Sequence, residues 1–576
     1  MKDMIRITSV AKIKSLRKKK KEILRTAQLL WICVLLLLPA LACAKTALLW
    51  VSPDGGHLTE AIDWYKNDKG EMYLFLPANA DVNALRVGYS GCDLILDDET
   101  GMAVSPGDNA QWLTPGVHML RVDGKTQKLT VMQGSAGLPT LYITTQSGSL
   151  DYIKKNKENR EAGSLVFVSP DGEHTYDGEL EHIKCRGNSS MTFPKKNYQI
   201  KLESSADLMN MGKAKKWILT SNYRDKSLLR NEIVFDVAET IGLPYTPEHM
   251  QAEVYINHEY RGVYLFSEKV EIGQNRINIA DLEKETEKLN EKDLSEYPLA
   301  GSKRGTRGAY KAYDIPVDAE DITGGYLVEF ESYASRFESE ASAYETARGN
   351  VLVIKSPEYA SASQMNYVAT RLQAFENAIF SPDGKDAESG LHYDDIVDKD
   401  SLVQKYLLEE FCKNYDGNYS SQYYYKPRDE VSEKFFAGPA WDYDSSFGSY
   451  AREDNAKRVL GGEGMWIGAG SSNRLWWPAL YSHSDFRQEV AVIWKSRMKP
   501  AIKALLGSKA EGDISLRSLY EYADRIRDSY AMNSIRWPRI ANPSGVVNTG
   551  NTLDKNIDYL AEFLLKRVDY LSEQWE

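Results

Sequence analysis

The sequence predicts an α+β protein in which an N-terminal all-β, sandwich-like domain precedes a β-rich lobe and a larger α-rich lobe. Three observations support this prediction. Short strands separated by turn residues fill residues 45–137, longer strands around one helix fill residues 138–275, and amphipathic helices dominate residues 320–576. With 42% hydrophobic and 11% aromatic residues, the 576-residue chain is apolar enough to build several folded cores.

Basic charge is concentrated at the start of the chain. Residues 1–44 hold ten Lys and Arg but two acidic residues, so they contribute +8 to the net charge of −11, and the remaining residues carry −19. Residues 45–576 are too acidic to neutralise the many phosphates of a nucleic acid, which argues against a nucleic-acid partner.

The same leader has the layout of a signal peptide, residues 1–44. An apolar run of 14 residues, Leu29 to Ala42, follows the basic stretch and is shorter than the roughly 20 residues that span a bilayer. An uncleaved anchor is therefore the weaker alternative. The small residues around Cys43 fit cleavage before Lys45, and lipidation of Cys43 as a lipoprotein signal is the other alternative. We expect an exported protein, secreted or at the cell surface, that contacts a membrane only through a lipid at Cys43.

The next segment, residues 45–137, contains short strands and turns and no residue that looks catalytic. We interpret it as an accessory or spacer domain. Its expected strands read TALLWV, EMYLFLPA, ALRVGYS, DLILDD, HMLRVDG and QKLTVMQG.

Residues 138–275 are expected to form a compact lobe of five or so strands around one helix. The helix has Leu229, Ile233 and Val237 on one face and ends at Gly242. The strands read LPTLYITT, SLVFVSP, LEHIKCRG, NYQIKLE and WILTSN, followed by the hairpin AEVYIN and VYLFSEKV.

A charged segment without apolar periodicity follows at residues 281–312, and we expect a solvated insertion or flexible loop there. GGYLVEFE at 324–331 is a further strand. The remainder is expected to be mostly helical, with amphipathic helices around residues 402–411, 519–530 and 557–571.

Several common catalytic signatures are absent. The sequence has no Walker A loop, GxSxG elbow or HExxH motif, and its eight histidines are scattered. Cys92, Cys185 and Cys412 are odd in number and irregularly spaced, so no disulfide framework is expected.

The densest group of polar residues lies between residues 412 and 448. Asp416 and Asn418 occupy a loop after a helix, and Asp442 and Asp444 follow a strand pair. Asp442 and Asp444 are two residues apart, so in extended backbone their carboxylates would face the same side. With an amide nearby, these carboxylates would suit Mg²⁺ bound jointly with phosphates. Asp416 would then orient a hydroxyl nucleophile. The alternative is that these residues cap turns.

The β-rich lobe offers a second group. Lys201 alternates with aliphatic residues on its strand and would reach a phosphate, paired with Glu232 or another acid, Asp236 or Glu239, of the following helix. Arg186 and Asn188, in the turn RGNSS, offer further anion contacts. The resulting order of strand lysine, acidic helix, Asp loop, strand pair and Asp loop is that of a protein kinase.

The chain resembles the CotH family, named after the spore coat protein H kinases. The resemblance is carried by CRGNSS, KKNYQIKL, WILTSNYRDKSLLRNEIVFDVAETIGLPYTP, EVYINHEYRGVYLFSEKVE, GGYLVEFE, DGNYSSQYYYKP and FFAGPAWDYDSSFG. It implies a two-lobed, divergent protein-kinase-like fold that transfers the γ-phosphate of ATP to serine-rich proteins with Mg²⁺ or Mn²⁺. Asp416 then matches the catalytic-loop aspartate and Asp442 or Asp444 the metal-binding aspartate. Lys201 is the phosphate lysine, with Lys196 as the alternative.

One feature departs from the family pattern. Many members place Asn a few residues after the catalytic-loop Asp, whereas this chain has Ser420-Ser421-Gln422 there and Asn418 closer to Asp416. A non-catalytic surface adhesion or scaffolding protein that retains the fold is therefore the alternative function. A glycoside hydrolase is a third, supported only by the presence of paired carboxylates.

Overall fold

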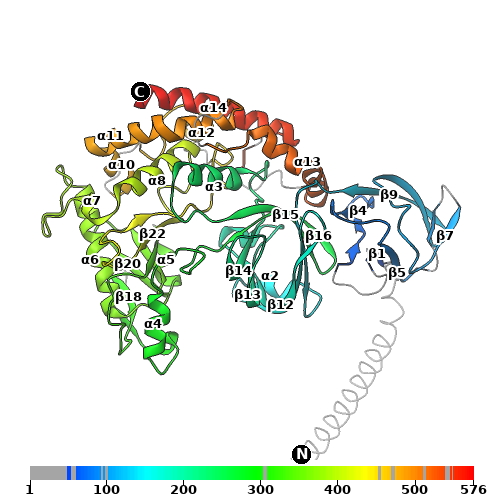
Figure 1. Ribbon diagram of the computed structural model, residues 1–576, viewed down its shortest axis with the longest axis horizontal. Helices are drawn as coiled ribbons and strands as arrows, with labels where there is room; N and C mark the ends of the chain where they lie inside the picture. Colours follow the sequence, from blue (N-terminus) through cyan, green and yellow to red (C-terminus); the bar gives the residue numbers. More distant parts are fainter. Residues whose placement is uncertain are drawn as a thin grey trace, which may run out of the picture.

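The computed structural model describes residues 48–53, 60–92, 95–97, 101–301, 308–331, 333–451, 456–468, 474–509, 514–538, 545–547 and 549–576. The expected signal peptide, residues 1–44, lies outside the described residues. Within these ranges no helix has the length and apolar character needed to cross a membrane. The fold mixes helices and sheets, as predicted (Figure 1).

The first described strands form two sheets that share one hydrophobic core, which includes Leu74, Leu120 and Val131. One sheet consists of β2 (Ile62–Asp63), β1 (Leu48–Ser52) and β5 (Arg86–Ser90). The other consists of β3 (Tyr65–Lys66), β4 (Met72–Leu76), β9 (Lys125–Gln133), β8 (Gly116–Val122), β6 (Ile95–Asp97) and β7 (Met102–Val104).

The next seven strands close into a barrel, which β10 and β15 complete by parallel pairing. In order around the barrel they are β10 (Thr140–Thr145), β11 (Glu161–Val168), β12 (His174–Arg186), β13 (Asn197–Asp207), β14 (Lys213–Thr220), β16 (Glu259–Glu268) and β15 (His249–Ile256). Alternate side chains, such as Tyr198 and Ile200 of β13, fill its interior. The short α2 (Asp151–Lys155) contributes Ile153 to the same core.

The helix expected at the centre of these strands lies outside the barrel instead. Helix α3 (Arg230–Ile241) ends at Gly242, whose φ of 90° is the left-handed conformation that glycine adopts readily. Because the strands close on themselves, the interior has no room for a helix, and α3 packs its apolar face into the core of the helical region. The expectation of strands around a helix was therefore wrong.

A second, seven-stranded sheet follows. Its order is β17 (Leu299–Gly301), β18 (Tyr310–Tyr313), β20 (Ser342–Glu345), β21 (Val351–Ser356), β19 (Tyr326–Phe330), β22 (Gln422–Lys426) and β23 (Phe436–Ala437). The strands at 342–356 were not expected. The charged segment 281–312 is not simply a solvated loop: it contains α4 (Leu282–Leu289) and the 3₁₀ turn η2 (Leu294–Glu296), and it buries Leu282 and Leu294.

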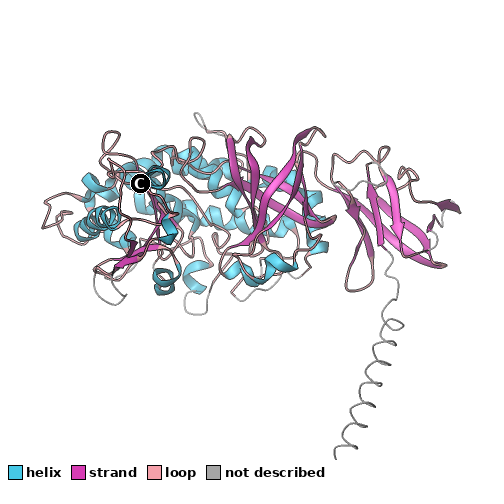
Figure 2. Cartoon of the chain, turned by 90° about the horizontal axis from the view of Figure 1, so that it is seen from below, coloured by secondary structure: helices cyan, strands magenta, loops and turns pink. Residues whose placement is uncertain are grey.

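Helices surround this sheet and one side of the barrel, and most of them share the largest core (Figures 1 and 2). They are α5 (Ala334–Ser339), α6 (Ala362–Ile379), α7 (Tyr393–Ile396), α8 (Lys399–Cys412), α9 (Ala456–Val459), α10 (Trp476–Tyr481), α11 (Ser484–Ile493), the π-helical turn η3 (Trp494–Met498), α12 (Lys499–Leu505), α13 (Leu519–Arg536) and α14 (Leu553–Trp575). The three long helices expected from periodicity are α8, α13 and α14. Of these, α8 is buried from Ser401 to Cys412 and underlies the candidate site.

Candidate functional site

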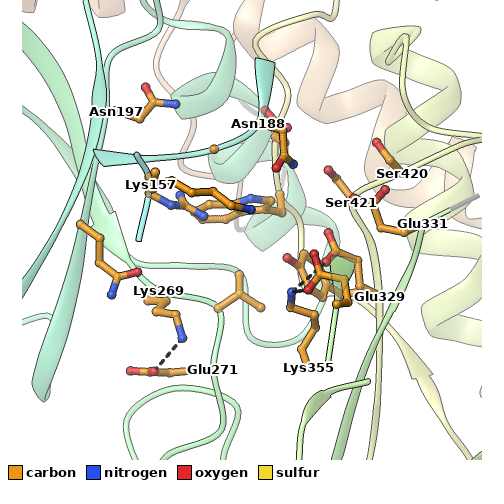
Figure 3. Close-up of a pocket in the computed structure, with 18 of the residues that line it drawn as sticks. Lys157, Asn188, Asn197, Lys269, Glu271, Glu329, Glu331, Lys355, Ser420 and Ser421 are labelled. Atoms are coloured by element: carbon orange, nitrogen blue, oxygen red, sulfur yellow. Dashed lines mark hydrogen bonds and ion pairs between the residues drawn. The ribbon is translucent and has the colours of Figure 1, made fainter. Parts of the chain in front are cut away.

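A cleft of about 1310 Å³ is lined on one side by the barrel and on the other by β19, β21, α4, α5 and two loops. The barrel wall, residues 157–272, contributes eight Lys and Arg against two Glu. The acidic wall, residues 281–450, contributes ten Asp and Glu against three Lys and Arg. Figure 3 shows the two sides, with Lys269 and Glu271 on the barrel side and Lys355 and Glu329 facing them. The cleft thus separates charge of opposite sign.

The first loop of the acidic wall carries Asp416. Helix α8 ends where Lys413 adopts a left-handed φ of 47°. The indole Nε1 of Trp466 then donates to the carbonyl of Asn414 at 2.6 Å, and Nε1 of Trp477 donates to that of Gly417 at 2.9 Å. Two buried tryptophans therefore hold the backbone on both sides of Asp416, whose side chain lines the cleft.

The second loop carries Asp442 and Asp444, which both line the cleft. The sequence led us to expect extended backbone here. The structure differs, because Asp442 has a left-handed φ of 66°. Helix α3 fixes this loop: Asn231 Oδ1 accepts from the backbone N–H of Tyr443 at 2.7 Å, and Nε of Arg230 donates to the carbonyl of Ser446 at 3.0 Å.

The two loops are hydrogen-bonded to each other. The N–H of Phe447 donates to the carbonyl of Cys412 at 2.6 Å, and the N–H of Tyr415 donates to that of Ser445 at 3.4 Å. These bonds bring three aspartates that are up to 28 residues apart in the chain into one site.

Burial and neighbouring carboxylates raise the pKa of two of these aspartates. Desolvation and, after it, the charge of Asp416 raise the pKa of Asp442 to about 6, although Arg186 and Arg224 lower it. Desolvation and the neighbouring Asp442 likewise raise the pKa of Asp444 to about 7. Asp442 is open to water inside the cleft, so its desolvation comes from the protein that surrounds a concave site. Negative charge is thus gathered where a cation would relieve the repulsion.

Buried charged side chains of α8 and α14 hold both loops in place. Lys405 donates to Glu409 and to the hydroxyl of Tyr443, each at 2.7 Å, and that hydroxyl donates to Glu409 at 2.7 Å. Arg567 of α14 forms a fully buried ion pair with Glu410, and Glu410 accepts from the N–H of Trp466 at 2.6 Å.

Of the four predicted anion-binding residues, three line the cleft and one does not. Arg186 lines the cleft with its guanidinium over the ring of Trp441, 5.0 Å from the ring centre, and Asn188 lies in the cleft and accepts from Arg336 at 3.1 Å. Lys201 also lines the cleft but pairs with Glu181 at 2.7 Å. Lys196 is not among the lining residues, because its Nζ donates to the carbonyl of Met191 at 2.5 Å.

Glu232 does not pair with Lys201. It is buried on α3, where it accepts from Gln251 at 3.0 Å and from Arg525 at 2.8 Å. Asp236 of the same helix pairs with His249 at 3.2 Å. The expected lysine–acid pair fails because α3 packs on the helices rather than on the outer face of β13.

Asn418 also differs from expectation, because it does not line the cleft. Its Nδ2 donates to the carbonyl of Ile467 at 3.4 Å, and its Oδ1 is buried without a hydrogen-bond partner. Ser420 and Ser421 line the cleft instead (Figure 3). The tight turn after Asp416, in which the N–H groups of Tyr419 and Ser420 donate to the carbonyl of Asp416, accounts for this placement.

Three further charged residues of the site were not expected: Glu329 of β19, Glu331 just after it and Lys355 of β21. Glu329 and Glu331 both line the cleft, and Lys355 of β21 lies 3.7 Å from Glu329. Burial raises the pKa of both glutamates, that of Glu331 to about 8. Their alternation in GGYLVEFE placed both on one face of a strand, a signal that the sequence contained.

The oxygen atoms of the acidic wall are possible ligands for a metal ion. In the part of the chain that the structure describes, no group of three or more His, Cys, Asp or Glu is already arranged to hold one. Asp442 and Asp444 nevertheless fit a hard divalent cation shared with a ligand, because their oxygens are the preferred donors and a cation would offset the desolvation and the carboxylate repulsion that raise their pKa values.

A comparison with protein families finds that the model described as CotH kinase protein matches residues 183–571. This match includes most of the barrel, both aspartate loops and the supporting helices. A comparison with curated proteins gives no match.

Proposed function

Because the matched segment covers most of the chain, this protein belongs to the CotH kinase protein family, and we propose that it transfers the γ-phosphate of ATP to hydroxyl groups, namely Ser or Thr of a protein. The observation that carries the proposal is the convergence of Asp416, Asp442 and Asp444 in a cleft whose other wall is basic. In this proposal the barrel and the helical region act as the two lobes of a divergent protein-kinase-like domain.

Asp442 and Asp444 are the residues that would hold Mg²⁺ or Mn²⁺. The ion would supply positive charge for the phosphate oxygens of ATP. Arg186 and Arg224, whose charges already lower the pKa of Asp442, would bind phosphate oxygens from the barrel side.

Asp416 is the residue that would orient the acceptor hydroxyl and accept its proton. Its loop is fixed by Trp466 and Trp477, so the carboxylate is positioned before substrate binds. Fixed charges and a fixed acceptor are what phosphoryl transfer requires, because positioning and electrostatic stabilisation account for most of its catalysis.

The experiment measures ATP binding with and without Mg²⁺ by calorimetry, and transfer of labelled γ-phosphate to a Ser-rich protein. Asp416→Asn and Asp442→Asn should each lower transfer by about 10²–10⁴-fold, the usual effect of losing such a group. Asp177→Asn is the matched control, because Asp177 is an exposed residue of β12 outside the cleft. Wild-type protein that neither binds ATP nor transfers phosphate overturns the proposal, and activity that survives both cleft substitutions overturns the residue assignment.

The second candidate function is a surface adhesion or scaffolding protein without turnover. The placement of Asn418 favours it, because that amide is turned away from the cleft and the second metal ligand expected of the family is missing. ATP binding without transfer in the same experiment would support this candidate.

We also propose that the protein is exported, on the basis of the basic and apolar leader in residues 1–44. The mass of the mature N-terminus tests this: cleavage before Lys45 indicates secretion, and a lipidated Cys43 indicates a lipoprotein. An intact Met1 in protein recovered from the producing cells overturns the proposal.

A further inference from the structure

The barrel wall carries more basic side chains than the phosphates of one nucleotide would contact. Six basic side chains lie on or beside the outer face of β12, β13 and β14 and line the cleft; we call this group the basic strand face. Its members are Arg160, His182, Lys184, Arg186, Lys201 and Lys216.

Strand register arranges these side chains in rows. His182 of β12 lies opposite Lys201 of β13, which lies opposite Lys216 of β14, so three basic residues share one cross-strand row. Since Glu161 lies opposite Ile183, Arg160 lies level with Lys184. Like charges directly opposite each other on a sheet destabilise it, as holds for Lys201 opposite Lys216 and for Arg160 level with Lys184. The basic strand face is therefore not explained by the stability of the barrel.

Burial and crowding both lower the pKa values of groups on this face. Desolvation, and after it the charge of Arg160, lowers the pKa of His182 to about 4. Desolvation also lowers the pKa of Lys184, and Arg160 and Arg186 lower it further. The Nε2 atom of His182 is buried without a hydrogen-bond partner.

Acidic neighbours offset only part of this charge. Lys201 pairs with Glu181 at 2.7 Å, Lys216 shares Glu271 with Lys269, and the nearest acid to Lys184, Glu158, is 3.9 Å away. Arg160 is exposed.

One triphosphate does not span the basic strand face. Arg186 lies opposite Asn197, four residues along β13 from Lys201, which corresponds to about 14 Å at the rise of a strand. Arg186 belongs to the reactive end, beside Asp442. Lys184 and His182 follow it along β12 in steps of two residues, about 7 Å each.

A step of about 7 Å is also the spacing of alternate side chains in an extended peptide. We infer that the basic strand face binds a segment of the protein substrate that already carries phosphoserines, so that earlier phosphorylation favours phosphorylation of the next serine. This inference rests on the proposed function and names its substrate class. An extended segment with its acceptor serine at Asp416 would place phosphates two and four residues away along β12.

The test measures binding of fluorescent Ser-rich peptides to the purified protein by anisotropy, without ATP or metal, so that it is independent of phosphoryl transfer. Peptides with phosphoserine two and four residues before or after the acceptor are compared with the unphosphorylated peptide and with an oligonucleotide of equal charge. A phosphopeptide of one orientation should bind at least about tenfold more tightly than the unphosphorylated peptide, as expected for one or more charge-assisted hydrogen bonds.

The double variant Arg160→Gln, Lys184→Gln should lose this preference. The matched control Lys213→Gln, Lys215→Gln removes two exposed charges of β14 outside the cleft and should retain it. Equal binding of phosphorylated and unphosphorylated peptides overturns the inference, as does equal loss in the control variant. Oligonucleotide binding as tight as phosphopeptide binding overturns the inference in favour of general polyanion binding. If ATP alone displaces the phosphopeptide from every variant, the face belongs to the nucleotide and the inference is overturned as well.

Discussion

The barrel wall of the cleft is carried by strands, whereas the reactive part of the acidic wall is carried by two loops that buried side chains hold in place. On the barrel wall, alternation along β12 and β13 is enough to bring Lys184 and Arg186 to the outer face. On the acidic wall, Asp416 and Asp442 depend on tryptophan indoles, on Asn231 and on buried ion pairs. Charge on a sheet therefore follows from the local sequence pattern, whereas the geometry of the carboxylates requires the whole helical core.

The largest expected effect comes from breaking the buried support of the acidic wall. Arg567→Met removes the partner of Glu410 and leaves a buried carboxylate unpaired, which should lower the free energy of unfolding by about 3–5 kcal/mol. Urea denaturation measures this. Lys566→Met is the control, because the pair of Lys566 with Glu562 is exposed to solvent and its loss should leave the free energy of unfolding close to the wild-type value. Equal effects at both positions would contradict the contrast between the walls.

A smaller loss is expected when the support is weakened but not broken. Tyr443→Phe removes the hydroxyl that joins Lys405 and Glu409, and it should cost about 1–3 kcal/mol of unfolding free energy. Phosphoryl transfer should fall as well, because Tyr443 lies between Asp442 and Asp444. A variant with unchanged stability would show that this network does not hold the loop.

The acidic wall should also make stability depend on pH. Because the folded state raises the pKa of Glu331 to about 8, this state binds more protons than the unfolded chain between about pH 4.5 and 8. Stability from this group is therefore full below pH 4.5 and is lost as the pH rises towards 8.

Glu331→Gln should flatten this slope, by on the order of 1 kcal/mol between pH 5 and 8. The exposed Glu338 of α5 supplies the control, Glu338→Gln. Unfolding measured across this pH range checks the prediction, and a steeper slope in Glu331→Gln would contradict it.

The smallest effect is expected on the barrel wall. Arg160→Gln with Lys184→Gln removes two like charges that lie level with each other, so stability should stay within about 0.5 kcal/mol of the wild type or rise slightly. Thermal unfolding measures this. A loss of several kcal/mol would mean that these cations hold the barrel together, and it would remove the argument that they serve a ligand.

Local pattern explains which parts of the site the sequence predicted. The helical periods of α8 and α14 and the alternation of Lys201 with aliphatic residues are local, so the sequence predicted them, although α8 proves to be buried on all sides rather than amphipathic. The left-handed φ of Asp442 and the turning of Asn418 towards Ile467 depend on contacts from segments distant in the chain. The closure of the barrel, which excluded α3, likewise depends on pairing between β10 and β15, which are separated by more than 100 residues.

Lys195 of the barrel has a consequence for the order of folding. Its buried ammonium donates to the carbonyls of Ser221 and Val263 and to Asn533 Oδ1 of α13. Ser135, just before the barrel, is hydrogen-bonded to Ser529 of the same helix. A chain growing from its N-terminus lacks Ser529 and Asn533 until about nine-tenths of it has been made. Such long-range closure slows folding, and it leaves the buried Lys195 ammonium without the Asn533 acceptor until α13 has been made.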